Sequence, residues 1–232
     1  MITIGFDLDD TLYYKTEPLK KTFIEFNATQ GLTFPQFLST FHKNSDIGFE
    51  HFSNNSWSLE DSYVFRITET MYEFGVNITR QEAINFQKKY NINQQKIKLA
   101  PYINQTINYL LNKNIQIIII TNGPSVKQRN KISTLGLDRY FPPKNIVVSE
   151  EENITKPNIE IFRNTEERLG IDVSKAWFIG DSYQNDIVGA TNAGWKTIWL
   201  NRDFKKSENH SNIATYTAKT TKDLNEYLLA IT

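Results

Sequence analysis

The chain has 232 residues, enough for one substantial hydrophobic core or for a core with a smaller second unit. Its 26 basic residues balance 26 acidic residues, so nothing in the composition indicates a polyanion-binding surface, and we expect no nucleic acid partner. The absence of cysteine excludes disulfides, thiolate metal sites and a cysteine nucleophile.

The first predicted element is a buried strand at Ile2–Phe6, and it runs directly into an acidic cluster. Asp7, Asp9 and Asp10 follow the last apolar residue of this strand. Carboxylates crowded at the edge of a core repel one another and are costly to desolvate. The cluster could be a solvated turn, because Asp is a common turn residue, or it could hold a cation.

The segment from Lys15 to Gln95 has no convincing strand pattern and is predicted to be a helical insertion. Helices expected within it include Glu17–Gly31, Leu59–Gly75 and Thr79–Asn91. Its many Phe and Tyr residues have spacings that favour packing, although some of the rings could line a pocket. We therefore expect residues 15–95 to form a helical domain, with residues 1–14 and 96–232 forming an α/β domain.

Beyond the insertion, apolar runs alternate with helical patterns. Strands are predicted at Ile115–Ile120, Ala176–Gly180 and Lys196–Leu200, with weaker ones at Asn145–Ser149 and Thr215–Ala218. Helices are predicted at Tyr102–Asn114, Ser125–Gly136, Lys156–Gly170, Gln184–Gly194 and Lys222–Ile231. Strand–helix–strand alternation of this kind predicts an α/β fold with a parallel sheet between two layers of helices.

The termini and the apolar runs bear on the location of the protein. The N-terminus lacks the order of residues found in a signal peptide, because it leads straight into the first strand. The longest apolar run, which begins at Ile115, is too short to span a bilayer. We expect a cytoplasmic protein that does not bind membranes, and the sequence does not indicate its oligomeric state.

Polar side chains follow each of the stronger predicted strands. In an open parallel sheet, ligands bind beyond the carboxyl ends of the strands. That rule brings together seven candidate site residues: Asp7, Asp9, Thr121, Asn122, Lys156, Asp181 and Asp186. Individually, several have simpler interpretations, since Lys156 stands at a helix entry, Thr121 could end a strand, and Asp186 could favour a helix N-terminus.

Together, these residue types indicate a phosphate site that contains a metal ion. Carboxylate ligands without Cys or His point to a hard ion such as Mg²⁺, which in proteins is commonly shared with a substrate phosphate. Lys156, the Thr121 hydroxyl and the backbone of the Asn122–Gly123 turn could bind the phosphoryl oxygens. Charge and donors arranged in this way are what phosphoryl transfer requires.

The first strand end also supplies a candidate nucleophile. The Asp7 carboxylate could form an acyl phosphate, which divides one difficult displacement into two easier ones. Asp9 lies two residues further on, and in extended backbone that spacing places both side chains on the same side. Asp9 could then protonate the leaving oxygen and later deprotonate the attacking water.

In order and spacing, these residues resemble the motifs of the haloacid dehalogenase-like (HAD) hydrolase superfamily. The motif DxDx[TV] is matched by Asp7–Thr11, and the apolar strand ending in Thr or Ser is matched at Thr121. The lysine ahead of a helix is matched by Lys156, and the motif GDxxxxD by Asp181 and Asp186. The match spans nearly the whole chain, and the helical insertion lies where this superfamily places a small cap domain.

The resemblance implies a Rossmann-like core, a helical cap and Mg²⁺ dependence. It implies that Asp7 is the nucleophile and Asp9 the acid and base, and that Thr121 and Lys156 hold the phosphoryl group. Metal contacts would come from the Asp7 carboxylate, the Asp9 backbone carbonyl and Asp181, supported by Asp186. In this superfamily the aspartate at the position of Asp9 favours a phosphohydrolase over a dehalogenase.

The sequence thus predicts a Mg²⁺-dependent phosphohydrolase that cleaves a small phosphomonoester through an aspartyl-phosphate. The substrate could be a nucleotide monophosphate or a sugar phosphate, and the appearance of the cap leans slightly towards the nucleotidases. Two alternatives remain open: a phosphomutase, which would return the phosphoryl group to a sugar, and a binding module that keeps the fold without the chemistry.

Overall fold

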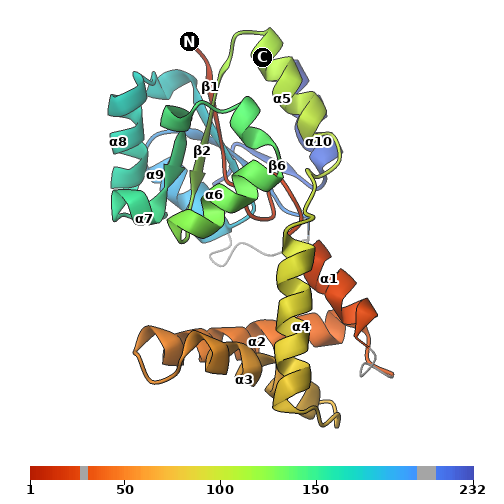
Figure 1. Ribbon diagram of the computed structural model, residues 1–232. Coiled ribbons are helices and arrows are strands. Elements are labelled where there is room, and N and C mark those ends of the chain that lie inside the picture. The colour runs from red at the N-terminus through yellow and green to blue at the C-terminus, as the bar shows by residue number, and fades with distance from the viewer. Residues whose placement is uncertain (27–30, 203–212) are drawn as a thin grey trace. The chain divides into compact units, whose positions relative to one another are not determined.

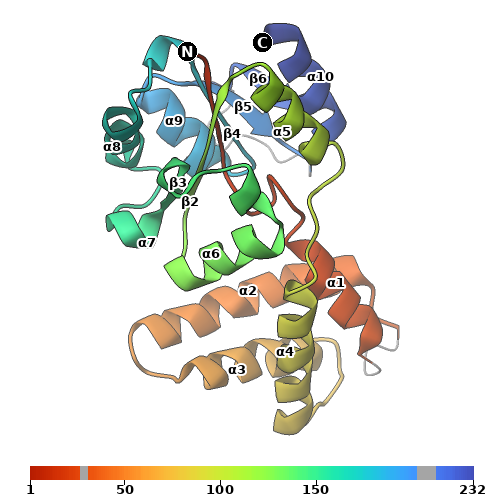
Figure 2. The same cartoon turned by 45° about the horizontal axis from the view of Figure 1, so that its top comes forward.

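The computed structural model describes residues 1–26, 31–202 and 213–232, and these form two compact units (Figure 1). One unit consists of Met1–Lys15 and Ile97–Thr232, and the other of Thr16–Lys96. The first contains a six-stranded sheet with helices on both faces, and the second is helical (Figure 2). The predicted fold class, an α/β sheet core with an inserted helical domain, is confirmed.

The sheet is parallel throughout, and its strand order is β3-β2-β1-β4-β5-β6. The strands are β1 (Thr3–Phe6), β2 (Gln116–Thr121), β3 (Ile146–Val148), β4 (Ala176–Gly180), β5 (Lys196–Leu200) and β6 (Tyr216–Ala218). The chain builds outwards from β1 in one direction and then, from β4, in the other. The strand order therefore reverses next to β1, which is where open α/β sheets bind their ligands.

Successive side chains of the strands enter two different cores, which explains the near-continuous apolar runs. Ile117 and Ile119 of β2 pack in the core that contains residues of α5 (Ile103–Asn112) and α10 (Thr221–Ile231). Ile118 and Ile120 pack instead with residues of α8 (Ile159–Leu169) and α9 (Gly189–Asn192) on the opposite face. A strand covered on both faces needs apolar residues at every position rather than at alternate ones.

The remaining helices of this unit are α6 (Ser125–Thr134) and α7 (Ser149–Glu152). Short 3₁₀ turns lie at Leu137–Arg139, Pro143–Asn145 and Val173–Lys175. The helix predicted at Gln184–Gly194 is instead two pieces, a π-helical turn η4 (Tyr183–Val188) followed by α9. Helix α8 ends as expected, because its C-cap Gly170 has a φ of 63° and adopts the left-handed conformation that glycine tolerates.

The helical unit contains α1 (Thr16–Glu25), α2 (Phe34–Ser53), α3 (Leu59–Tyr72) and α4 (Arg80–Gln94). Residues 16–26 and 31–96 contain no strand, as predicted. The predicted helix Glu17–Gly31 corresponds to α1, and part of it, residues 27–30, lies outside the described residues. Helix α2 was not among the helices predicted individually, although Thr33 and Gln36 form a capping box at its start.

The aromatic residues of this unit mostly form its own core. Phe37 and Phe86 are fully buried, and Phe23 packs against Phe37 with ring centroids 4.9 Å apart. Tyr72, by contrast, is exposed. The packing interpretation of the Phe-rich sequence therefore holds for the residues that make this core. None of the helices in the described part of the chain has the length and apolar character that crossing a membrane requires.

Candidate active site

The site lies at the carboxyl edge of the sheet, where β1, β2 and β4 end side by side. Asp7 directly follows β1, and its backbone N–H donates to the carbonyl of Ile179 in β4 at 2.8 Å. Thr121 is the last residue of β2, and Asp181 directly follows β4. The parallel register therefore brings three segments that are far apart in the sequence to one place.

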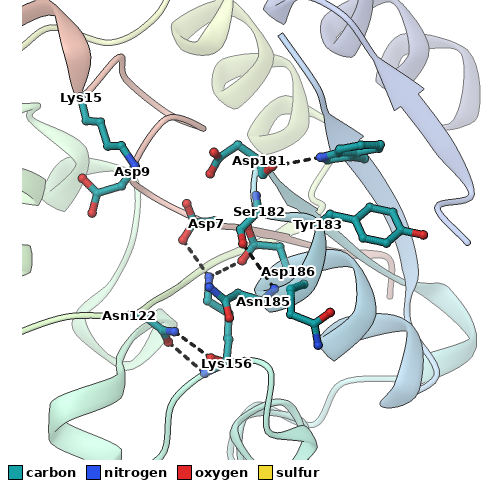
Figure 3. A pocket seen from close by; sticks show the side chains of 12 residues that line it. Asp7, Asp9, Lys15, Asn122, Lys156, Asp181, Ser182, Tyr183, Asn185 and Asp186 are labelled. Carbon is teal, nitrogen blue, oxygen red and sulfur yellow. Dashed lines mark hydrogen bonds and ion pairs between the residues drawn. The ribbon is translucent and has the colours of Figure 1, made fainter. Parts of the chain in front are cut away.

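Lys156 is the buried centre of this arrangement (Figure 3). Its Nζ lies 2.7 Å from Oδ1 of Asp7 and 2.7 Å from Oδ1 of Asp186. Burial alone would lower the pKa of Lys156, but the carboxylates of Asp186 and Asp7 raise it above its ordinary value. Lys156 is therefore a cation at neutral pH and binds the two carboxylates to each other.

Burial raises the pKa of both carboxyl groups that contact Lys156. Burial raises the pKa of Asp7 to about 7, although the neighbouring Lys156 ammonium acts to lower it. Burial also raises the pKa of Asp186, again against the effect of Lys156. Desolvation therefore outweighs the single cation, and additional positive charge at this position would favour the ionised forms.

The loop after β4 brings Asp186 back against the sheet. The backbone N–H of Ser182 donates to Oδ2 of Asp186 at 2.9 Å, within the turn that leads into η4. A Cβ atom on Gly180 would lie only 2.3 Å from the carboxyl group of Asp186, so this close approach requires glycine. Trp199 of β5 fixes the other side of the loop, since its indole N–H donates to the carbonyl of Asp181 at 2.9 Å.

The donor set fits a hard divalent cation. Asp7, Asp181 and Asp186 each offer a carboxylate oxygen, and these oxygens all lie within 4.8 Å of one another. Mg²⁺ prefers oxygen ligands and is commonly bound through few carboxylates together with substrate phosphate. The three residues come from two neighbouring strand ends, so they form a candidate metal centre. Asp9 is expected to contact the metal through its backbone carbonyl, and its side chain is not part of this carboxylate group.

The Asp9 carboxylate instead turns towards α6. Lys131 Nζ lies 2.7 Å and 2.8 Å from its two oxygens, and Gln128 Nε2 lies 2.9 Å from Oδ2. The Tyr13 hydroxyl also donates to Oδ1. Burial acts to raise the pKa of Asp9, but Lys131 and the other donors bring it below its ordinary value. Asp7 and Asp9 therefore have different partners, although both line the same cavity.

The predicted phosphate-binding residues are also engaged within the protein. Thr121 Oγ1 accepts a hydrogen bond of 2.6 Å from Gln128. Asn122 exchanges two hydrogen bonds of 2.9 Å with the backbone N–H and carbonyl of Lys156 (Figure 3). The backbone N–H of Gly123 donates to Ser149 Oγ at 3.0 Å. The side chain of Asn122 thus holds the Lys156 segment in place, and the Gly123 N–H already has an acceptor.

A cavity of about 620 Å³ opens over these groups. It is lined by Asp7, Asp9, Lys15, Asn122, Lys156, Asp181, Ser182, Tyr183, Gln184, Asn185, Asp186 and Trp199. Six of the seven predicted site residues line this cavity, five of them with a carboxylate or an ammonium group and the sixth, Asn122, with an amide. The seventh, Thr121, is buried and does not line it. The sequence predictions did not include Lys131 and Gln128, whose i, i+3 spacing on α6 was the available signal.

Comparison with known proteins shows that the chain is similar to phosphatases. A glyceraldehyde 3-phosphate phosphatase from Methanothermobacter thermautotrophicus is 28% identical over 208 residues, covering 88% of each chain. The pyrimidine 5'-nucleotidase YjjG of Escherichia coli is 43% identical over 89 residues, covering 38% of this chain and 39% of that one.

Among solved structures, the putative HAD-hydrolase YfnB from Bacillus subtilis, described as bound to magnesium, covers 98% of both chains with 25% identity and a TM-score of 0.70. The family model of the haloacid dehalogenase-like hydrolases matches residues 2–194. The chain belongs to the haloacid dehalogenase-like hydrolase family.

Proposed function

We propose that the protein is a Mg²⁺-dependent phosphohydrolase that cleaves a small phosphomonoester through an aspartyl-phosphate at Asp7. The observation that carries the proposal is the cluster of the Asp7, Asp181 and Asp186 carboxylates, two of which, Asp7 and Asp186, pair with the buried Lys156. Such a cluster is costly unless it binds something that balances its charge. The names of the relatives, a triose phosphate phosphatase and a nucleotidase, support a phosphoester as the substrate.

Asp7, Asp181 and Asp186 would hold the metal ion, with the Asp9 backbone carbonyl as a further ligand. A divalent ion held there would supply positive charge that offsets the charge of the phosphoryl oxygens and of the carboxylates. The magnesium of the related Bacillus subtilis structure supports this choice of ion.

Side chains of the protein carry out the proposed phosphoryl transfer and the hydrolysis that follows it. Asp9 first takes up a proton from solvent, because its pairing with Lys131 favours the ionised carboxylate. An oxygen of Asp7 then attacks phosphorus, the bond between phosphorus and the ester oxygen breaks, and Asp9 gives that proton to the departing alcohol. Lys156 and the Thr121 hydroxyl donate to the phosphoryl oxygens. Asp9 then takes a proton from water, whose oxygen attacks phosphorus, so that inorganic phosphate leaves and the Asp7 carboxylate is regenerated.

The substrate class stays broad in this proposal, because a nucleotide monophosphate and a sugar phosphate share the group that is cleaved. The helical unit is proposed to act as the cap that selects between them. The cytoplasmic location expected from the sequence stays a prediction.

The proposal is tested by phosphate release from a panel of nucleotide monophosphates and sugar phosphates, with Mg²⁺ and with EDTA. We expect release that requires Mg²⁺ and is concentrated on a few related esters, with none from the Asp7→Asn variant. Isomerisation of a sugar phosphate primed by a bisphosphate, without net release, would favour a phosphomutase. Binding of phosphoesters without either reaction would favour a binding module.

A further inference from the structure

Helix α6 brings two side chains to the candidate acid and base of the site. Gln128 and Lys131 are three residues apart, so they lie on one face of the helix. Gln128 is buried, and the side chain of Lys131 is 25% exposed. Both contact Asp9, which is more than a hundred residues away in the sequence. The sheet of this unit, rather than local sequence, creates the contact.

The Asp9 carboxylate receives as many hydrogen bonds as its oxygens can accept. Its two oxygens have about four lone-pair directions. Oδ1 receives the Tyr13 hydroxyl and the Lys131 ammonium, and Oδ2 receives Gln128 and the same ammonium. The four directions are therefore filled by groups of the protein itself. Asp9 must open one of these contacts before it can exchange a proton with a substrate or with water.

Lys131 also fixes the orientation of Gln128. Its Nζ lies 2.7 Å from Gln128 Oε1, and because an ammonium group only donates, the atom facing it must be the carboxamide oxygen. The amide nitrogen of Gln128 then faces the other way, towards Thr121 Oγ1 at 2.6 Å and Asp9 Oδ2. Since Thr121 accepts this bond, its own hydroxyl proton is directed away from Gln128.

We propose that Lys131 is a positioning residue for Asp9, and that it acts directly on the carboxylate and indirectly through Gln128. The ammonium contacts both carboxylate oxygens, so one contact can open towards the substrate while the other keeps the side chain oriented. Neither Tyr13 nor Gln128 can do this, because each donates to a single oxygen. The inference rests on the proposed function, since it assigns Lys131 to the acid and base step.

The test compares esters that differ in their need for an acid. An aryl ester such as p-nitrophenyl phosphate releases a stable phenolate, whereas an alkyl ester releases a poor leaving group that requires a proton. The variants are Lys131→Met, Lys131→Arg, Asp9→Asn and the double variant Asp9→Asn with Lys131→Met. Lys127→Met is the matched control, because Lys127 lies on the same helix and is exposed.

We expect Lys131→Met to slow phosphorylation of Asp7, measured in a single turnover by rapid quench, by about 100-fold with the alkyl ester, the effect of a small misplacement in an active site. With the aryl ester, whose leaving group needs no acid, the same rate should fall by less than about threefold. Lys131→Arg should restore part of the alkyl rate, since it keeps a cation that can contact both oxygens. The double variant should be no slower than Asp9→Asn alone, because one residue acts through the other.

Equal losses in the phosphorylation rate with both esters, or a double variant whose losses multiply, would overturn the inference and show that Lys131 makes only a structural ion pair. Unchanged alkyl turnover in Lys131→Met would do the same. If circular dichroism shows that Lys131→Met is unfolded, Lys131→Arg tests the inference instead. A positioning role predicts that this variant loses rate selectively on the alkyl ester. Failure of the wild type to release phosphate from any ester would instead count against the proposed function.

Discussion

Replacing Lys156 by methionine removes the buried cation of the site while keeping a chain of similar length. The side chain of Lys156 is 1% exposed, and its ammonium makes contacts of 2.7 Å with Asp7 and Asp186. Removing one partner of a buried ion pair typically costs about 3–5 kcal/mol, because the other charge stays buried. Asp7 can limit that cost by taking up a proton, since burial already raises its pKa to about 7. We expect a loss of about 3 kcal/mol in the free energy of unfolding at pH 7 in EDTA.

Urea titration with EDTA and with saturating Mg²⁺ measures this effect. Mg²⁺ should stabilise Lys156→Met at least as much as the wild type, because the three carboxylates then lack their internal cation. Turnover should nevertheless fall by about 10²–10³-fold, the usual cost of losing a donor to the developing charge.

The matched control is Lys175→Met, which breaks an exposed pair with Asp172 at 3.3 Å and should cost less than about 1 kcal/mol. A loss in Lys156→Met as small as in this control, with no difference between EDTA and Mg²⁺, would refute the assignment of Lys156 as the internal counter-ion.

Three further outcomes follow from the geometry. Gly180→Ala places a Cβ atom 2.3 Å from Asp186, so calorimetry should show Mg²⁺ affinity lowered about 10-fold or more, whereas unchanged affinity would mean that Asp186 does not support the metal. Glu151→Gln removes a 2.6 Å ion pair with Arg129, and this pair lowers the pKa of Glu151 in the folded protein. The stabilisation that the pair provides is therefore present above the unfolded pKa near 4.5, and it is lost as pH falls through the lower folded pKa. Its cost in urea titrations should be below about 1 kcal/mol at pH 7 and vanish towards pH 3; a cost that grows as pH falls would contradict the sign. Phe37→Ala should cost about 3–5 kcal/mol, and a loss below about 1 kcal/mol would show that Phe37 is not central to the helical core.

The sheet could be predicted from the sequence because each strand is buried on both faces. Ile117–Ile120 enter two cores in alternation, so the strand appears in the sequence as an unbroken apolar run. The rule that ligands bind at the carboxyl ends of parallel strands then predicts from the sequence alone that Asp7, Thr121 and Asp181 lie together. Burial and topology, which the sequence pattern encodes directly, were sufficient for this part of the site.

The orientation of Asp9 could not be predicted in the same way. The argument from alternating side chains applies to extended backbone, but β1 ends at Phe6, and Asp10 has a φ of 58° in the left-handed region. The backbone is therefore not extended from Asp7 to Asp10, and Asp9 faces Lys131 rather than the partners of Asp7. No local pattern specifies a contact between residues 122 positions apart.

The loop after β4 shows the same limit. The spacing of apolar residues predicted one helix over Gln184–Gly194, but Asp186 must reach back to Lys156 and lie against Gly180. The first turn, Tyr183–Val188, is accordingly π-helical, and a regular helix begins only at Gly189. Such a widened turn at a site is a local departure from regular geometry that sequence periodicity does not reveal.

The most direct test of the central claim is detection of the covalent intermediate. The enzyme is mixed with Mg²⁺ and the best ester of the panel, quenched in acid within the first turnover, digested, and analysed by mass spectrometry. The proposed chemistry predicts one phosphoryl group on the peptide that contains Asp7, attached to that side chain and absent from Asp7→Asn. Phosphate release during the same interval without any phosphorylated Asp7 would contradict it and indicate direct attack by water.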